Sequence, residues 1–386
     1  MLADSTADIL VIGAGIAAAS AGYWLAQHGK VALLERESQP GAHSTGRSAA
    51  LFMESYGTAQ VRALTMASRA FLDAPPEGFA EVPILTPRGA LMVATDDLVP
   101  QLDTQWEVMR AVADRARRLD GRQTCEMVPV LRPDRIVGGV YEPDACDIDV
   151  DALHQGFLKG LRRRGGRVVC DAEVTHIERV GDVWQVRAGD RTYAAPLLVN
   201  AAGAWADVVG RMAGAQSIGL VPRRRSAFMF APPQGLEFAR WPMCAGVDES
   251  WYIKPEAGQM LGSPANADPV EPQDVQPEEL DIAIAIDRIE TMTTLRIVRP
   301  TRTWAGLRSF VADGDLVGGF DSKLPEFFWI AAQGGYGIQT SAAMGEACAA
   351  LAMGQAIPDR IARFGLSEAM LSPARLRTAP AARSTS

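Results

Sequence analysis

Residues 8–35 read DILVIGAGIAAASAGYWLAQHGKVALLE: an apolar run, a glycine-rich turn, a helical segment, a second apolar run and an acid. Ile9 to Ile12 suit a strand that is covered on both faces. Gly13 permits a tight turn, and Gly15 lets the backbone approach a pyrophosphate at the start of the helix. Ala18 replaces the third glycine of the pattern, which is tolerated where helix and strand pack closely. The segment predicts a strand–turn–helix–strand unit that binds a dinucleotide.

The acid that ends this unit is Glu35. Its carboxylate can accept hydrogen bonds from a ribose, and its charge would repel a 2′-phosphate. An isolated glycine motif would be weak support, but here the strand, helix, second strand and acid follow in register. The alternative, a purely structural glycine turn, is less consistent with this order.

The bulk composition is that of a globular protein. The chain has 386 residues, of which 48% are hydrophobic and 22% charged, and its formal net charge is -8. This length suggests two or three domains. Because phosphate binding requires clustered Lys and Arg, the acidic balance argues against nucleic acid as a partner. The short runs Arg162–Arg164 and Arg223–Arg225 do not change this expectation.

The five cysteines include no CxxC pair and are odd in number, so we expect reduced thiols, no metal site and no disulfide framework. The first apolar run lacks a basic leader and continues into the glycine turn, which predicts a core strand instead of a signal peptide. No apolar stretch reaches the roughly 20 residues of a membrane-spanning helix. We therefore expect a cytoplasmic protein without a transmembrane segment.

Two more glycine-rich turns follow apolar strands further along the chain. The strand predicted at Leu197–Asn200 runs into AAGAW, and the one at Phe327–Ala332 runs into QGGYG before an Ala-rich helix. Small residues in such turns allow close approach of the backbone to a ligand. Between them and the first unit, residues 147–166 predict an amphipathic helix, and residues 167–188 predict three strands.

From about residue 222 to residue 303, alternating segments such as SAFMFAPP and SWYIKP predict an antiparallel sheet with long connections. The predicted fold is α/β (α+β with two domains), a Rossmann-like nucleotide domain with an inserted antiparallel-sheet domain. We assign residues 1–80, 147–216 and 306–372 to the nucleotide domain, and 81–146 and 217–305 to the inserted domain, which would bind the substrate. Residues 373–386 are expected to form a disordered tail.

Taken together, these blocks resemble the D-amino-acid oxidase superfamily of flavoenzymes, and most of all the bacterial FAD-dependent D-arginine dehydrogenases. The matching blocks are VIGAGIA (11–17), LERE (34–37), PGAHSTGRSAA (40–50), VNAAGAW (199–205), RRSAFMFAPP (224–233), GSPANADPVE (262–271), TWAGLRSFVADGDLV (303–317) and QGGYGIQTSAAMGEA (333–347).

This resemblance implies non-covalent FAD and the oxidation of a D-amino acid, by hydride transfer to flavin N5, to an imino acid that water converts to the 2-oxo acid and ammonia. Arg225 and Arg308 match the carboxylate anchors of the family, and a guanidinium can bind a carboxylate through two parallel hydrogen bonds. Tyr56 and Tyr252 match its pocket tyrosines, and the carbonyl of Gly335 would accept from the amino group. No side chain is an obvious general base.

The resemblance also implies which residues contact the cofactor. They are Gly13, Gly15, Ala17, Ala18, Glu35, Arg36, Ser44, Thr45, Arg47, Ser48, Ala49, Ala50, Leu51, Val174, Ala202, Gly203, Trp205, Gly334, Gly335, Tyr336, Gly337, Ile338 and Gln339.

Several assignments have structural alternatives. Arg308 could form a buried ion pair, although an unpaired charge in its apolar block would be unfavourable. Strand alternation places Arg223 and Arg225 on one face, and only the resemblance chooses Arg225. Tyr252 could be a cross-strand packing residue.

Two residues near the cofactor are also open to other interpretations. We expect His43 to be a loop histidine bonded to the backbone, in preference to a covalent flavin link or a base. Tyr336 could be a turn residue beside the flavin.

Two positions depart from the D-arginine enzymes, which carry Glu at the position of Ala90 and His at that of Leu51. Because a buried cation without a partner is disfavoured, we expect substrates with an uncharged side chain, or a cyclic secondary amine such as a D-proline derivative. The residues expected to line the side-chain pocket are Leu51, Met53, Ala90, Met243 and Ala245.

Other functions remain open at this stage. A 2-hydroxy acid or an N-substituted amino acid would also present a carboxylate to two arginines. A flavin-binding protein without turnover and a nicotinamide-dependent enzyme are further alternatives. The electron acceptor, quinone or oxygen, is not determined by these residues, nor is the oligomeric state.

Overall fold

The structure is a computed structural model and describes residues 6–232 and 234–377. Its helices are α1 (Ile16–Leu25), α2 (Ala59–Asp73), α3 (Val99–Val112), α4 (Gly121–Met127), α5 (Val150–Arg163), α6 (Ala206–Met212), α7 (Glu279–Met292), α8 (Ser341–Ala352), α9 (Asp359–Ala362) and α10 (Glu368–Leu371), with 3-10 turns η1 (Asp96–Leu98), η2 (Gly203–Trp205) and η3 (Pro373–Arg377). Its strands are β1 (Ile9–Ile12), β2 (Val31–Leu34), β3 (Leu51–Phe52), β4 (Leu85–Pro87), β5 (Ala90–Ala94), β6 (Arg117–Asp120), β7 (Gly138–Glu142), β8 (Cys146–Ile148), β9 (Arg167–Val169), β10 (Val174–Val180), β11 (Val183–Ala188), β12 (Arg191–Ala195), β13 (Leu197–Asn200), β14 (Val221–Phe230), β15 (Met243–Gly246), β16 (Tyr252–Glu256), β17 (Gln259–Ser263), β18 (Asp268–Pro269), β19 (Arg302–Phe310), β20 (Val317–Phe320) and β21 (Phe327–Ala331).

The predicted nucleotide unit is the centre of a six-stranded sheet with the order β20-β21-β13-β1-β2-β9. Strands β21, β13, β1, β2 and β9 are parallel, and β20 is an antiparallel edge. The residues of β1, β2, β13 and β21 are buried throughout, as their continuous apolar sequence predicts for strands covered on both faces. The three glycine turns therefore meet at the carboxyl ends of the adjacent strands β1, β13 and β21. This arrangement confirms the predicted fold class.

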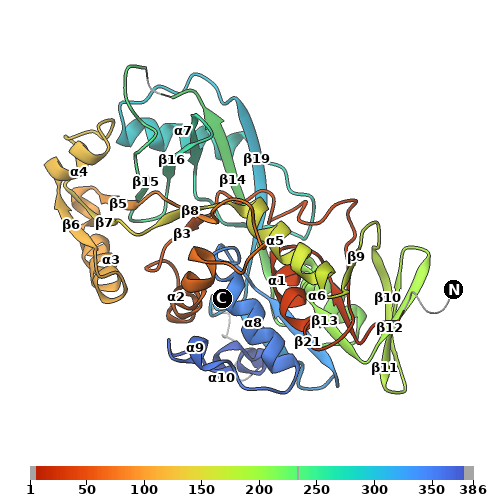
Figure 1. The fold of residues 1–386 in the computed structure, drawn as a ribbon. Helices are drawn as coiled ribbons and strands as arrows, with labels where there is room; N and C mark the ends of the chain where they lie inside the picture. Colours follow the sequence, from red (N-terminus) through yellow and green to blue (C-terminus); the bar gives the residue numbers. More distant parts are fainter. Residues whose placement is uncertain (1–5, 233, 378–386) are drawn as a thin grey trace, which may run out of the picture.

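Helices and a small sheet cover the two faces of the parallel sheet. On one face α1 packs against α5 and α8, and α2 packs against α8 (Figure 1). On the other face the β10–β12 meander and α6 bury residues such as Trp184, Tyr193 and Val209 against β1, β13 and β21. This layering fixes the position of the first glycine turn, because α1 is held on both sides.

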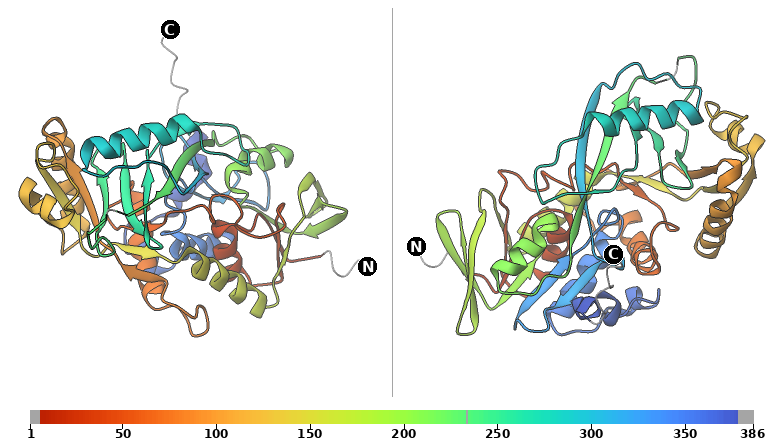
Figure 2. Two further views of the ribbon diagram at one scale, coloured as in Figure 1. Left: turned by 90° about the horizontal axis from the view of Figure 1, so that it is seen from above. Right: turned by 180° about the vertical axis from the view of Figure 1, so that it is seen from behind.

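A nine-stranded sheet forms the second part of the molecule, above the first in Figure 1 and with α7 over one face. Its longest pairing joins β14 to β19 from Val221–Phe310 to Met229–Arg302. The strands are mainly antiparallel, as predicted, but β5 and β15 are parallel. Figure 2 shows α3 and α4 at the far end of this sheet, away from the parallel one.

The helix α7 was not predicted, because the alternation in LDIAIAIDRI suggests a strand. Its buried residues Ile282, Ala285 and Ile289 follow the helical spacing of three and four. Acids in its first turn also favour a helix start. The helical signal was therefore present alongside the alternation.

The domain division remains a proposal. Strand β19 crosses the predicted boundary at residues 305 and 306, because it pairs with β14 along its whole length. The predicted disordered tail needs a correction, since Pro373–Arg377 form η3. Arg375 pairs with Asp313, and Arg377 pairs with the buried Asp321, which anchors this turn. Residues 378–386 lie outside the described part of the chain.

Within residues 6–232 and 234–377, no helix has both the length and the apolar character needed to cross a membrane.

Candidate functional site

The first glycine turn is tightly packed against the neighbouring turn. Gly13 has φ +103°, and a Cβ there would lie 2.6 Å from the carbonyl oxygen of Ala201. Its N–H donates to Leu34 O at 2.8 Å, which fixes the turn to β2. Helix α1 begins after Gly15, which has no side chain to cap it, and Thr45 Oγ1 accepts from the N–H of Ile16 at 3.0 Å. This helix start is suited to the phosphates of a ligand.

A cavity of about 260 Å³ opens over this turn. It is lined by most of the residues predicted for the nucleotide: Gly13, Gly15, Ala17, Glu35, Arg36, Ser44, Thr45, Val174, Ala202, Gly203, Trp205 and Gly334. Ala18 is instead fully buried in the packing of α1. The three sequence-distant turns therefore line one cavity.

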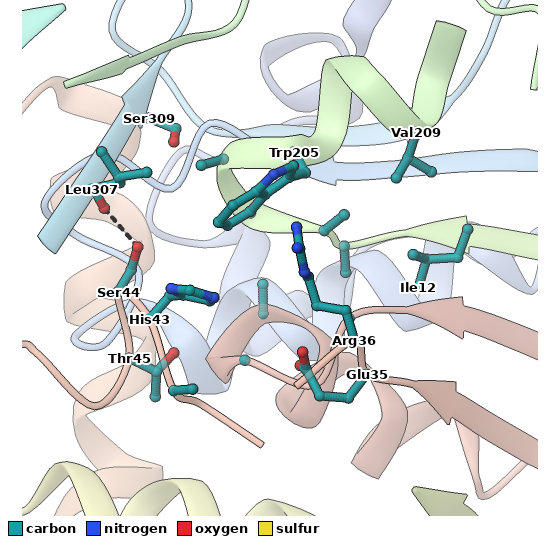
Figure 3. Close-up of a pocket in the computed structure, with 18 of the residues that line it drawn as sticks. Ile12, Glu35, Arg36, His43, Ser44, Thr45, Trp205, Val209, Leu307 and Ser309 are labelled. Atoms are coloured by element: carbon teal, nitrogen blue, oxygen red, sulfur yellow. Dashed lines mark hydrogen bonds between the residues drawn. The ribbon is translucent and has the colours of Figure 1, made fainter. Parts of the chain in front are cut away.

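The end of β2 contributes two charged side chains to this cavity (Figure 3). Glu35 accepts hydrogen bonds from the N–H of Ala14 at 2.9 Å and of Glu37 at 3.1 Å, so its carboxylate is held in place. The Arg36 guanidinium lies 4.9 Å from the centre of the Trp205 ring. Both residues were predicted, but the stacking of Arg36 on Trp205 could not be read from the sequence.

His43 also lines the cavity, and its bonding differs from the expectation. Its Nε2 lies 2.9 Å from Glu37 Oε1, so it is bonded to a side chain and not to the backbone. Its Nδ1 is buried and has no hydrogen-bond partner among the described residues. The glycine turn at the start of α1 and the unsatisfied Nδ1 of His43 leave polar groups available to a bound dinucleotide, and these residues fit FAD.

Two smaller cavities continue the first toward β14 and β19. The middle one shares Ser44, Thr45 and Gly334 with the nucleotide cavity and adds Arg47, Ser48, Ala49, Gly335, Gly337 and Ile338. Arg47 holds this loop against β19 by donating to Ala305 O at 3.2 Å, and Ser44 donates to Leu307 O at 2.7 Å. The path from the nucleotide turn to the substrate side is therefore continuous.

The third cavity, of about 100 Å³, brings together the four side chains predicted for catalysis: Tyr56, Arg225, Tyr252 and Arg308. Arg223 lies opposite Arg308 on the paired strands, but its Nη1 donates to Ala267 O at 2.9 Å and it does not line the cavity. Arg225 lies opposite Gly306, where the missing side chain leaves space. The structure thus places Arg225, and not Arg223, at the site.

Neither Arg225 nor Arg308 forms an ion pair with any residue that the structure describes. Arg225 Nε donates to the carbonyl of Asn266 at 2.6 Å, and Arg308 Nη1 lies 3.5 Å from Tyr56 Oη. Arg224, on the opposite face of β14, is paired with Asp281 at 2.8 Å. Two cations without an acid partner in one cavity form a site for an anion, because an anion would offset their mutual repulsion.

Burial, and then repulsion from Arg308, lowers the pKa of Arg225 to about 10. This pKa still lies well above neutral pH, so both guanidinium groups are charged there, and an anion bound between them would relieve their repulsion.

The third glycine turn supports the arginine pair. A Cβ on Gly335 would lie 2.6 Å from Arg308 Nη1, so only glycine leaves this guanidinium in place. Tyr336 packs against Tyr56, with ring centres 5.0 Å apart, and does not line the cavities. Burial raises the pKa of Tyr336, so its phenol stays neutral.

Much of the remaining wall of the third cavity is apolar. It includes the predicted Leu51, Met53, Met243 and Ala245, and also Ala50 and Gln339 from the predicted cofactor set. Ala90 is fully buried behind this wall, in a cluster with Met53 and Ala145, and does not line the cavity.

Sequence reasoning missed five lining residues, Met92, Glu249, Trp251, Lys254 and Ala265. Trp251 and Lys254 flank the predicted Tyr252 on β16 and its turn, but only the strand pairing shows that they reach the cavity. Lys254 is buried and paired with Asp147 at 2.8 Å and Glu256 at 2.7 Å.

Comparison with known proteins gives consistent matches. The family model "DAO: FAD dependent oxidoreductase" matches residues 8–351. The chain is 26% identical over 263 residues to dimethylglycine dehydrogenase, mitochondrial, of Rattus norvegicus, covering 67% of this chain and 31% of that protein. It is 25% identical over 268 residues to glycine oxidase of Geobacillus kaustophilus, covering 66% of this chain and 68% of that protein. The chain therefore spans less than a third of the dimethylglycine dehydrogenase.

Solved structures show the same fold. The crystal structure of glycine oxidase from Geobacillus kaustophilus has a TM-score of 0.81 at 20% identity and covers 94% of this chain and 99% of that one. L-alpha-glycerophosphate oxidase from Mycoplasma pneumoniae with FAD bound has a TM-score of 0.81 at 18% identity and covers 90% and 95%. None of these matches singles out the D-arginine dehydrogenases.

Proposed function

The chain belongs to the DAO family of FAD-dependent oxidoreductases, and we propose that it oxidises the Cα–N bond of an α-amino carboxylate, a D-amino acid being the first candidate. One observation carries this proposal: the guanidinium groups of Arg225 and Arg308 lie in one cavity without acid partners, beside Gly335. A pair of such groups binds a carboxylate by charge-assisted hydrogen bonds.

Each residue of the site has a separate role in the proposed reaction. The three glycine turns would hold FAD, which would supply an acceptor for the two electrons of the substrate. Arg225 and Arg308 hold the carboxylate and thereby fix the orientation of Cα. The Gly335 carbonyl accepts from the amino group, and Tyr56 and Tyr252 form walls that limit water. The substrate loses its ammonium proton on binding or to solvent, and water converts the imino product to the 2-oxo acid.

The apolar wall supports a preference for uncharged side chains. Leu51, Met53, Met92 and Met243 offer no partner for a distal guanidinium, and a second cation would compete with the α-ammonium group for Glu249, the one acid among the described lining residues. We expect anaerobic bleaching of the flavin by D-Met, D-Leu or D-Phe to be faster than by D-Arg. Stopped-flow absorbance measures the rates, and the L-enantiomers are the control for chirality. A clear preference for D-Arg would refute this proposal.

A second candidate is an N-substituted amino acid. Dimethylglycine and sarcosine dehydrogenases are among the matched proteins, and both are named for such substrates. Product analysis separates the possibilities, because a primary amino acid releases ammonia, an N-methyl amino acid releases methylamine or formaldehyde, and a 2-hydroxy acid releases no amine. Yellow protein that no amine or hydroxy acid bleaches would instead indicate a flavin-binding protein without turnover.

A further inference from the structure

The mouth of the substrate cavity carries an acidic side chain that the proposed reaction does not use. Glu249 lies in the turn between β15 and β16 and lines the same cavity as Arg225 and Arg308. Of the described residues that line this cavity, it is the one acid. Its carboxylate makes no hydrogen bond or ion pair with the described part of the chain.

The backbone holds Glu249 firmly in this place. Its N–H donates to Gly246 O at 2.9 Å, and the N–H of Gly246 donates to Trp251 O at 3.1 Å. Arg288 Nη1 donates to the carbonyl of Ser250 at 2.8 Å, which fixes the tip of the turn. Glu249 has φ +54°, a region where glycine and asparagine are favoured.

The charges of the cavity form a pattern. Lys254 is neutralised by Asp147 and Glu256, so among the described lining residues the charges without an ion-pair partner are those of Arg225 and Arg308 and of the solvent-exposed Glu249. Burial and the neighbouring Arg308 lower the pKa of Arg225, whereas Glu249 acts on it in the opposite direction, as expected for charges that line one cavity. A carboxylate complements the cations, and a cationic nitrogen on the same molecule complements the anion.

We infer that Glu249 is a charge filter that admits carboxylates bearing a cationic nitrogen and disfavours 2-hydroxy acids and dicarboxylates. This inference rests on the proposed function only in taking a carboxylate as the ligand of the arginine pair. Without Glu249, a cavity with two guanidinium groups would favour the most anionic ligand. With it, an ammonium or a secondary ammonium group gains attraction while a second carboxylate is repelled.

The test compares an amino acid with its 2-hydroxy analogue, D-alanine with D-lactate, on the FAD-loaded protein at pH 8. Glu249→Gln removes the charge and keeps the shape. We expect this variant to lower the Kd of D-lactate and of succinate about tenfold, and to weaken the binding of D-alanine by a similar factor. The Kd values of D-lactate and succinate come from perturbation of the oxidised flavin spectrum. The binding of D-alanine is followed by its KM, and its kcat is measured separately.

Two variants serve as controls. Glu249→Asp keeps the charge and should restore most of the discrimination. Asp248→Asn removes the charge of the neighbouring side chain, which accepts hydrogen bonds from Ser250 and does not line the cavity. This variant should leave the affinities for both ligands unchanged. The inference is wrong if Glu249→Gln changes the affinities for D-lactate and D-alanine by the same factor in the same direction, or leaves both unchanged. It is also wrong if Asp248→Asn changes these affinities as Glu249→Gln is expected to.

This outcome is distinct from failure of the proposed function. If no amine bleaches the flavin but Glu249→Gln still tightens anion binding, the filter stands and the amino-acid reaction is refuted. If amines are oxidised and anion binding does not respond, the reaction stands and the filter is refuted.

Discussion

Replacing Arg308 by methionine should lower kcat/KM for the amino-acid substrate by about a thousandfold. Removing one partner of a buried, hydrogen-bonded charge pair costs roughly 3–5 kcal/mol, because the other charge is left without compensation. Every 1.4 kcal/mol is about a factor of ten. We expect most of the loss in KM, with a further loss in kcat, because the carboxylate also orients Cα. Steady-state kinetics and anaerobic flavin reduction measure the two effects.

The matched control for this variant is Arg224→Met on the neighbouring strand. Arg308 has no acid partner to lose, so its replacement should leave the melting temperature unchanged or raise it. Arg224 is paired with the buried Asp281, so its replacement should destabilise the protein and leave KM near that of the parent. If Arg308→Met retains its affinity for the substrate, Arg308 is not a carboxylate anchor.

Replacing Gly13 by alanine should give a protein that is purified without its yellow cofactor. The backbone at Gly13 has φ +103°, and the added Cβ would lie 2.6 Å from Ala201 O, an atom of the second glycine turn. Both turns would have to move, and both line the nucleotide cavity. Strain of about 1–3 kcal/mol at such a φ adds to this clash, so we expect the affinity for FAD to fall on the order of a hundredfold.

The control for conformational strain alone is Gly165→Ala. Gly165 has φ +82° after α5, and nothing lies within 4 Å of an added Cβ. This variant should lose some stability, about 1 kcal/mol, but keep its flavin. Flavin content is read from the ratio of absorbance at the flavin band to that at 280 nm. Normal flavin content in Gly13→Ala would show that the turn does not hold the cofactor.

Local patterns predicted the parts of the fold that depend on short segments of chain. The apolar strands, the three glycine turns and the amphipathic helix α5 each follow from spacing within about 20 residues. The helix α7 was missed because its Ile and Ala residues fit both a strand period and a helical one. Packing against β14 and β17 selects the helix, and packing is not a local property.

In the candidate site, too, some features follow from local sequence and others only from the packing of distant segments. Sequence and resemblance led to Arg308, Tyr56, Tyr252 and Gly335, whereas strand alternation could not choose between Arg223 and Arg225 and only the resemblance favoured Arg225. The strand register made that choice, since Arg225 faces the space at Gly306. Ala90 was expected in the side-chain pocket, yet the β5–β7 pairing buries it behind Met53. Glu249 was not predicted at all, because its position depends on a turn whose ends pair with distant strands.

By itself the sequence determined a dinucleotide unit, because that unit depends on glycine backbone freedom and on side-chain chemistry at short range, and the family resemblance added FAD and the anchoring arginines. Only the tertiary structure decided which charges meet in one cavity and which remain without partners. The physical reason is that charge compensation depends on distance through space: β14, β19 and the β15–β16 turn are far apart along the chain and come together only when the nine-stranded sheet forms.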